Sequence, residues 1–129
     1  MKLFTLGALD NEASDPDTFV GSARLTRMNG VTSSPPTNVY RVAFEASART
    51  NWHTHSGYQL LQVIEGVCRF QKAGESVREA AAGDLVSIAP EERHWHGASP
   101  DGPMTHIAIN LDATTNWFGP VSDDDYAGG

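Results

Sequence analysis

Hydrophobic residues alternate with polar ones in short runs, and Gly or Pro turns separate these runs along most of the chain. The clearest runs lie at 39–45, 59–65, 67–71, 77–79, 85–88, 94–98 and 105–112. A period of two residues is typical of a strand with one buried face, and the breaks have the composition of tight turns. Because no long helical period is present, the pattern predicts an all-β sandwich or barrel of short strands.

The two ends of the chain depart from this regular pattern. In the first part we expect an edge strand at 2–6, a polar loop at 10–17, a strand at 19–28 and turns throughout 29–38. Beyond Ala113 the strand pattern fades. Ser122 followed by three aspartates is typical of a helix start, so the end is either a short helix or a frayed tail.

Composition narrows the classes of protein to consider. The 129 residues are 40% hydrophobic and 19% charged, which fits a single globular domain over 1–129. A formal net charge of −7 without a Lys/Arg cluster argues against nucleic-acid binding. No apolar run approaches the ~20 residues of a membrane span. The single cysteine, Cys68, excludes an internal disulfide and fits a reducing compartment, so we expect a soluble, cytoplasmic protein.

Candidate chemistry is concentrated in the segment WHTHSGYQLLQVIEG, residues 52–66. His53 and His55 are two positions apart, so in a strand both imidazoles project from the same face. Gln59 follows across a turn at 56–58 and is in phase with the apolar residues of the next strand. Two imidazoles and an amide oxygen that converge on one point indicate a metal site, although an H-x-H pair alone is equally typical of structural histidines.

The distribution of histidine favours the metal site. All five histidines fall in three predicted strands, and within each strand their spacing puts them on one face; they are His53, His55, His94, His96 and His106. A barrel can bring such inward faces together in its interior. Unrelated structural histidines would not be grouped in this way.

Two segments resemble the two sequence motifs of the cupin family. The first is HTHSGYQ followed by six residues and Gly66, and the second is GDLVSIAPEERH at 83–94. Cupins are small antiparallel β-barrels, also called double-stranded β-helices or jelly rolls. They hold a metal with two histidines and an acidic or amide residue from the first motif and one histidine from the second. The resemblance therefore implies a cupin barrel with four metal ligands: His53, His55, Gln59 and His94.

The chain departs from the cupin motifs at two points. Gln59 stands where many cupins have Glu, which changes the charge of the site. Ala89 and Glu91 replace the usual Pro and Gly of the second motif, which only reshapes a turn because Pro90 and His94 keep their places.

The expected ligands also bear on the chemistry of the metal. Three neutral imidazoles and a neutral amide leave the +2 charge of a divalent ion uncompensated, which makes it a stronger Lewis acid. Imidazole suits Fe, Ni, Cu and Zn, whereas oxygen donors suit Mn. The ligands alone leave the metal open, and the resemblance favours one Mn²⁺ per chain, with Fe²⁺, Zn²⁺ and Ni²⁺ as alternatives.

Further segments, over nearly the whole chain, resemble a subgroup of small bacterial cupins that includes manganese-dependent hydroxynitrile lyases. These segments are ARTNWHTH, HWHGASP, PMTHIAI and VSDDDY. The lyases cleave or form cyanohydrins, and the resemblance implies Thr50, His96 and His106 as active-site residues. The chain differs at Asn110, where the lyases carry Gln, and at Tyr40, where a small residue is usual.

The expected substrate pocket follows from the same strands. Its residues are Tyr40, Val42, Phe44 and Asn110, of which the first three share one strand face and line either the core or the pocket. His96 is two residues from His94 and therefore faces the same cavity. Either His96 or His106 can supply a general base near neutral pH, and for each the alternative is a structural histidine.

Three functions remain open from the sequence. The first is a metal-dependent hydroxynitrile lyase that converts a cyanohydrin to an aldehyde and HCN, with His106 or His96 removing the hydroxyl proton. The second is a metal-dependent dioxygenase, and the third is a non-catalytic protein that binds a metal or a small molecule. The expected partners are a small-molecule substrate and further copies of the chain in a homodimer or homotetramer, which would cover sheet edges. Nucleic acid and membranes are not expected partners.

Overall fold

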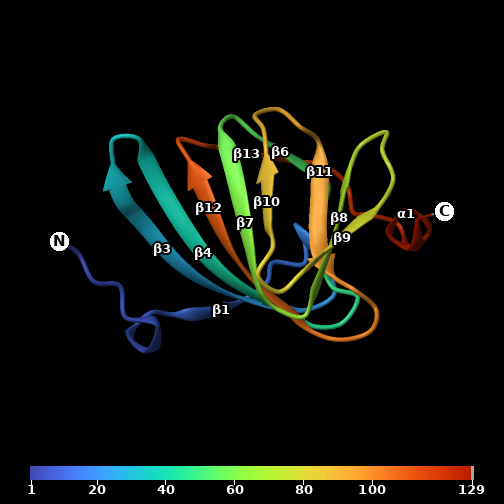
Figure 1. Ribbon diagram of the computed structural model, residues 1–129, viewed down its shortest axis with the longest axis horizontal. Coiled ribbons are helices and arrows are strands. Elements are labelled where there is room, and N and C mark those ends of the chain that lie inside the picture. The colour runs from blue at the N-terminus through green and yellow to red at the C-terminus, as the bar shows by residue number, and fades with distance from the viewer. Residues whose placement is uncertain (129) are drawn as a thin grey trace.

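The computed structural model describes residues 1–128 as two antiparallel sheets that enclose a common core (Figure 1). The first sheet consists, in spatial order, of β1 (Asn11–Ala13), β3 (Ala23–Ser33), β4 (Pro36–Phe44), β12 (Met104–Leu111), β7 (Tyr58–Glu65) and β10 (Leu85–Ile88). The second consists of β13 (Thr115–Trp117), β6 (His53–His55), β11 (His94–Ala98), β5 (Arg49–Thr50) and β2 (Phe19–Val20), with β8 (Val67–Lys72) on β11 and β9 (Arg78–Ala81) on β8. The predicted all-β antiparallel fold is confirmed.

β4 and β12 lie side by side and show how the interior changes along their length (Figure 1). Phe44 and Met104 are partners at one end of this pair, and both are almost fully buried in the apolar core. Further along, Tyr40 and Ala108 are partners, and both line a cavity. Because alternate residues of a strand point inward, the same two strands supply first the core and then the cavity wall.

The β3–β4 hairpin is longer than the sequence predicts. Strand pairing continues across most of 29–38, so the prediction of turns throughout this segment is wrong. Gly30 lies within a register shift of this pairing, has a φ of 62°, and donates its N–H to the side-chain oxygen of Asn38 at 2.8 Å. A bulge at a glycine lets the strand absorb the irregularity and continue.

The N-terminal segment also folds differently from the prediction. Residues 2–6 form no strand; a single 3-10 turn, η1 (Leu6–Ala8), is followed by β1 in the polar segment that was expected to be a loop. Arg24 on β3 donates from Nε to the side-chain oxygen of Asn11 and from Nη2 to its backbone carbonyl, each at 2.6 Å. These contacts attach β1 to the sheet, and a local pattern cannot reveal them because they come from a tertiary neighbour.

The short C-terminal helix α1 (Asp123–Ala127) is confirmed, together with its cap. The Ser122 hydroxyl accepts a hydrogen bond from the backbone N–H of Asp125 at 3.1 Å. Tyr126 packs on Trp95 with ring centroids 5.5 Å apart, so α1 covers the outer face of β11. Among residues 1–128, no helix has the length and apolar character that crossing a membrane requires.

Candidate metal centre and active site

β6 and β11 bring four histidines to one region of the interior. β6 carries His53 and His55, β11 carries His94 and His96, and all four are buried. His53 and His94 are direct partners in the ladder between the two strands. The ring centroid of His53 lies 4.2 Å from that of His94 and 4.9 Å from that of His55. The convergence that the H-x-H spacing predicts is therefore present.

Backbone carbonyls fix the orientation of two of these rings. His53 donates from Nδ1 to the carbonyl of Asn51 at 2.8 Å, and His94 donates from Nδ1 to the carbonyl of Glu92 at 2.7 Å. A carbonyl can only accept, so in the neutral rings the proton is on Nδ1 and the lone pair is on Nε2. Both Nε2 atoms are thereby available as metal ligands.

Gln59 and His55 are held by similar contacts from neighbouring strands. Gln59 on β7 is the register partner of Asn110 on β12 and donates from Nε2 to the Asn110 side-chain oxygen at 2.9 Å. This bond turns Oε1 of Gln59 toward His94, whose Nε2 lies 3.3 Å away. His55 is bonded through Nδ1 to the hydroxyl of Thr115 on β13 at 2.9 Å, which leaves its Nε2 free. The sequence did not predict β13.

The resulting arrangement of lone pairs fits a bound cation. Oε1 of Gln59 and Nε2 of His94 both present lone pairs across 3.3 Å, which is unfavourable unless a positive species lies between them. Nε2 of His55 and of His96 are buried and have no hydrogen-bond partner among residues 1–128. The ligand atoms of His53, His94 and His96 lie within 4.8 Å of one another, so three buried histidines can hold a metal ion. Imidazole and amide oxygen donors suit a divalent transition metal.

The three-histidine set differs in one member from the three histidines that were predicted as ligands. It contains His96, predicted to be catalytic, in place of His55, predicted to be a ligand. The His55 ring nevertheless lies 5.4 Å from that of His94, so both rings belong to the same cluster. The structure thus brings all four predicted ligands together and adds His96 beside them.

Burial lowers the pKa of all five histidines. The pKa of His55 is lowered to about 4 by burial and then by the nearby His94, and the pKa of His106 is lowered to about 4 by burial. Burial, with added repulsion from His94 and His55, holds the pKa of His53 well below its usual range. Burial also lowers the pKa values of His94 and His96. At neutral pH the rings are therefore uncharged, the form in which imidazole binds a metal.

The predicted catalytic residues form a second group beside the ligands. Nε2 of His106 on β12 lies 2.9 Å from Nδ1 of His96. The hydroxyl of Thr50 accepts a hydrogen bond from the backbone N–H of His96 at 3.2 Å. His96 and Thr50 line the cavity, whereas His106 is fully buried behind His96. The sequence prediction did not distinguish the two histidines, and this placement does.

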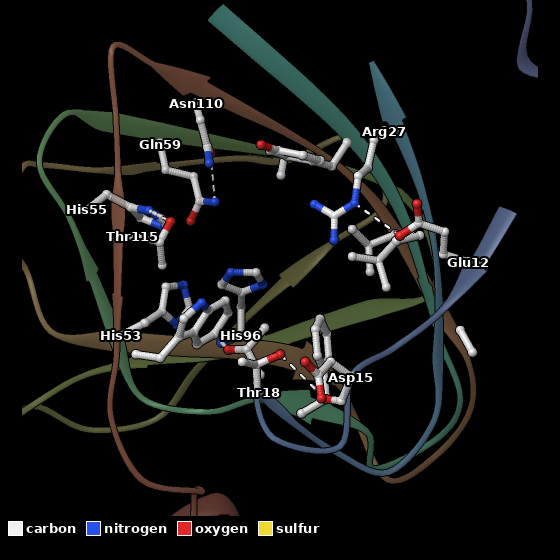
Figure 2. Close-up of a pocket in the computed structure, with 18 residues that line it drawn as sticks. Glu12, Asp15, Thr18, Arg27, His53, His55, Gln59, His96, Asn110 and Thr115 are labelled. Atoms are coloured by element: carbon white, nitrogen blue, oxygen red, sulfur yellow. Dashed lines mark hydrogen bonds and ion pairs between the residues drawn. The ribbon is translucent and has the colours of Figure 1, made fainter. Parts of the chain in front are cut away.

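A cavity of about 450 Å³ opens in front of the histidines (Figure 2). Of the predicted pocket residues, Tyr40, Val42 and Asn110 line it. Phe44 does not: it is only 2% exposed and packs edge-on against the His106 ring at 5.2 Å, so its assignment to the pocket is corrected to the core. A volume of this size suits a small organic ligand.

The sequence analysis missed ten further residues that line this cavity, two of which, Thr115 and Trp117, lie beside the histidines. The ten are Glu12, Ala13, Asp15, Thr18, Phe19, Leu25, Arg27, Ala108, Thr115 and Trp117. Glu12 and Asp15 belong to the N-terminal segment expected to be a loop. Arg27 gave a usable signal, because it is in phase with Leu25 and Ala23 on an otherwise apolar inward face of β3.

Comparison with known proteins agrees with this fold. Residues 38–119 match the family described as AraC-like ligand binding domain. An (R)-mandelonitrile lyase from Granulicella tundricola is 36% identical, over 98% of each chain.

Solved structures give the same result for the fold. A cupin-like protein from Thermotoga maritima has a TM-score of 0.83 and 34% identity, over 98% of this chain and 95% of the other. The polyketide cyclase RemF from Streptomyces resistomycificus, with a TM-score of 0.71 and 15% identity over 98% and 90% of the two chains, shares the fold alone. The chain belongs to the cupins, in the family of the AraC-like ligand binding domain.

Proposed function

We propose that this protein is a metal-dependent hydroxynitrile lyase, which cleaves a cyanohydrin to an aldehyde and HCN and catalyses the reverse reaction. The observation that carries the proposal is the His96–His106 pair beside a cluster of neutral metal-binding side chains. The 36% identity to an (R)-mandelonitrile lyase over nearly the whole chain supports the same reaction class.

The metal would be held by His53, His55, Gln59 and His94. We propose Mn²⁺ as the ion, with Fe²⁺, Zn²⁺ and Ni²⁺ as the alternatives that elemental analysis separates. A divalent ion held by four neutral ligands would supply Lewis-acid stabilisation of the negative charge that develops in the reaction. Asn110 has an orienting part in this set, because its hydrogen bond to Gln59 Nε2 aims the amide oxygen at the ligand cluster.

His96 is the base in this proposal, because it lines the cavity and His106 does not. For Nε2 of His96 to accept a proton, the proton of the neutral ring must lie on Nδ1, where it is donated to His106 Nε2 across 2.9 Å. The low pKa of His106, caused by burial, keeps that ring neutral and able to accept. When His96 gains the substrate proton, His106 stabilises the resulting charge.

The cleavage step then balances as follows. The cyanohydrin hydroxyl gives its proton to His96 Nε2, and the electron pair of the O–H bond forms the aldehyde C=O bond. The C–CN bond breaks and its electron pair leaves with cyanide, which later takes the proton from His96 to give HCN. Thr50 keeps its own hydroxyl proton, since its oxygen accepts from the His96 backbone, and can donate it to the substrate oxygen.

The test is aldehyde release from mandelonitrile by metal-loaded protein, with metal-free protein as the control, across pH 4–8. Metal-dependent release supports the proposal. No release above the control, from wild type and from Tyr40→Ala with its enlarged pocket, would show the lyase assignment to be wrong. Oxygen consumption with a β-diketone would then support the dioxygenase alternative, and saturable binding without turnover would support a binding role.

A further inference from the structure

The side of the cavity opposite the histidines carries charged residues that the proposed reaction does not require. We call Glu12, Asp15 and Arg27 the mouth wall; all three line the cavity. Figure 2 shows the Arg27 guanidinium directed into the cavity, with its terminal nitrogens toward the space between the mouth wall and the histidines. An aldehyde such as benzaldehyde has no group that would need a cation at this position.

Arg27 is held in place by two neighbours and keeps its two terminal nitrogens free. Its Nε donates to Oε2 of Glu12 at 3.1 Å, and its guanidinium lies over the Tyr40 ring at 5.6 Å. Neither Nη1 nor Nη2 of Arg27 donates a hydrogen bond to any of residues 1–128. A guanidinium with two free nitrogens side by side matches the two oxygens of a carboxylate.

The acidic residues of the mouth wall offset the charge of Arg27 but leave its two terminal nitrogens without a partner. Glu12 is already occupied by the Nε of Arg27. Oδ1 of Asp15 accepts a hydrogen bond from the backbone N–H of Asp17 at 2.8 Å, so this carboxylate stabilises the turn of its own loop. The Arg27 and Glu12 side chains are 47% and 49% exposed, which places their contact at the mouth, where an incoming ligand can reach it. Because carboxylates can only accept, the free nitrogens of Arg27 are the donors that this wall offers to a ligand.

We propose that the cavity binds substrates that carry a carboxylate, which Arg27 receives, while the reacting carbonyl or hydroxyl lies at the histidine end. The reaction itself rests on the proposed function. If that function holds, the substrate is the cyanohydrin of an aldehyde that carries a carboxylate at the end away from the reacting carbon. The recognition of the carboxylate rests on Arg27 alone and holds for any reaction at the histidines.

The test compares two probes of nearly the same shape and different charge, 4-formylbenzoate and 4-formylbenzamide. Their affinities for the metal-loaded protein are measured by calorimetry, without any need for turnover. The wild type should bind the carboxylate at least about tenfold more tightly than the amide, as expected for a charge-assisted hydrogen bond. Arg27→Gln should bind the two probes equally.

Two further variants sharpen the result. Glu12→Gln removes the carboxylate that competes for Arg27 and should increase the preference for 4-formylbenzoate. Arg41→Gln is the matched control: it removes one positive charge from β4, beside β3, at a position that does not line the cavity, and should leave the preference unchanged. Thermal unfolding of each variant verifies that it is folded.

The outcomes separate this inference from the proposed function. Equal affinities of the wild type for the two probes, or a preference that survives Arg27→Gln because the carboxylate binds elsewhere, would overturn the carboxylate site. Cleavage of mandelonitrile in that case leaves the lyase proposal intact. A preference that depends on Arg27 in a protein that cleaves no cyanohydrin would support the carboxylate site and overturn the lyase.

Discussion

The two sides of the cavity are built in different ways. The histidine wall, His53, His55, His94 and His96, is buried, and each ring projects from a strand of the second sheet. In the mouth wall, Glu12 on β1 and Arg27 on β3 are half-exposed, belong to paired strands of the first sheet and are joined by an ion pair. Strand pairing holds the backbone of both walls, and the difference between them is burial: a side chain of the mouth wall can be replaced at the surface, whereas a substitution in the histidine wall changes the packed interior. If the proposed function and the carboxylate site hold, reaction chemistry and substrate choice are located on separable parts of the fold.

The largest expected effect is the loss of the metal from the histidine wall. His53→Ala combined with His94→Ala removes two of the three rings whose ligand atoms lie within 4.8 Å of one another, so metal content should fall from about one ion per chain to none. Elemental analysis of the purified protein measures this. Arg27→Gln, in the mouth wall, is the control and should retain the metal. Undiminished metal in the double variant would exclude this site.

The next effect separates His96 from the residue behind it. His96→Ala should lower kcat by about 10²–10⁴-fold, the usual contribution of a general base. His106→Ala should lower kcat by only about 10–100-fold, because His106 acts through its 2.9 Å contact with His96. The pH–rate profile of His106→Ala should also shift, while its metal content stays normal. A larger loss in His106→Ala than in His96→Ala would show that His106 is the base.

Stability of the metal-free protein should fall in acid because of the histidine wall and His106. Burial lowers the pKa of His106 to about 4, whereas the same group titrates near 6.5 in the unfolded chain. Between these values the unfolded state binds more protons, so the free energy of unfolding decreases as pH falls from about 6.5 to about 4, by about 3 kcal/mol for this group. Above about pH 6.5 these histidines are neutral in both the folded and the unfolded state, so they no longer change the free energy of unfolding with pH.

Thermal unfolding at pH 7, 5 and 4 measures this dependence. His106→Gln should reduce the slope between pH 6.5 and 4, whereas Arg27→Gln in the mouth wall should keep it. An unfolding temperature that does not change over this range would contradict the neutral, buried state assigned to the histidines.

The smallest effect connects the two sides through Tyr40, which lines the cavity and supports Arg27. Tyr40→Ala enlarges the pocket and should raise the cleavage rate of a neutral aromatic cyanohydrin. It also removes the ring under the guanidinium, an interaction of about 0.5–1 kcal/mol, so the preference for 4-formylbenzoate should fall about two- to fivefold. Rate measurements and calorimetry on the same preparation check both changes. A higher rate with an unchanged preference for 4-formylbenzoate would show that Tyr40 acts by size alone.

The sequence was sufficient to predict the histidine wall because its geometry is local. The spacing of His53 and His55, and of His94 and His96, fixes a common face as soon as each segment is a strand. The prediction of short antiparallel strands and of the Ser122 cap was correct for the same reason. The pairing of β6 with β11, which completes the wall, is a tertiary fact that only the cupin resemblance supplied.

Of the mouth wall only Arg27 had a usable signal in the sequence, and the wall as a whole could not be predicted because its residues come together through contacts between distant segments. Glu12 lies in a polar stretch that forms a strand by pairing with β3, and Arg24 of β3 also binds Asn11 of this stretch. The core position of Phe44 was missed for a different reason. A strand pattern identifies which residues point inward, but it does not show where along the strand the interior changes from packed core to cavity. The single domain, the identity of the metal and the oligomeric state stay predictions.

Trp117 gives the histidine wall a built-in optical reporter. Its indole ring lies 4.7 Å from the His53 ring and lines the cavity. Trp95 is buried beneath α1 and Trp52 packs with Arg93 outside the cavity, so neither residue lines it. Paramagnetic ions quench indole emission at short range. If the proposed Mn²⁺ binds at the histidine wall, the fluorescence of the unlabelled protein can therefore follow its binding in real time, with Trp117→Phe as the control that lacks this signal.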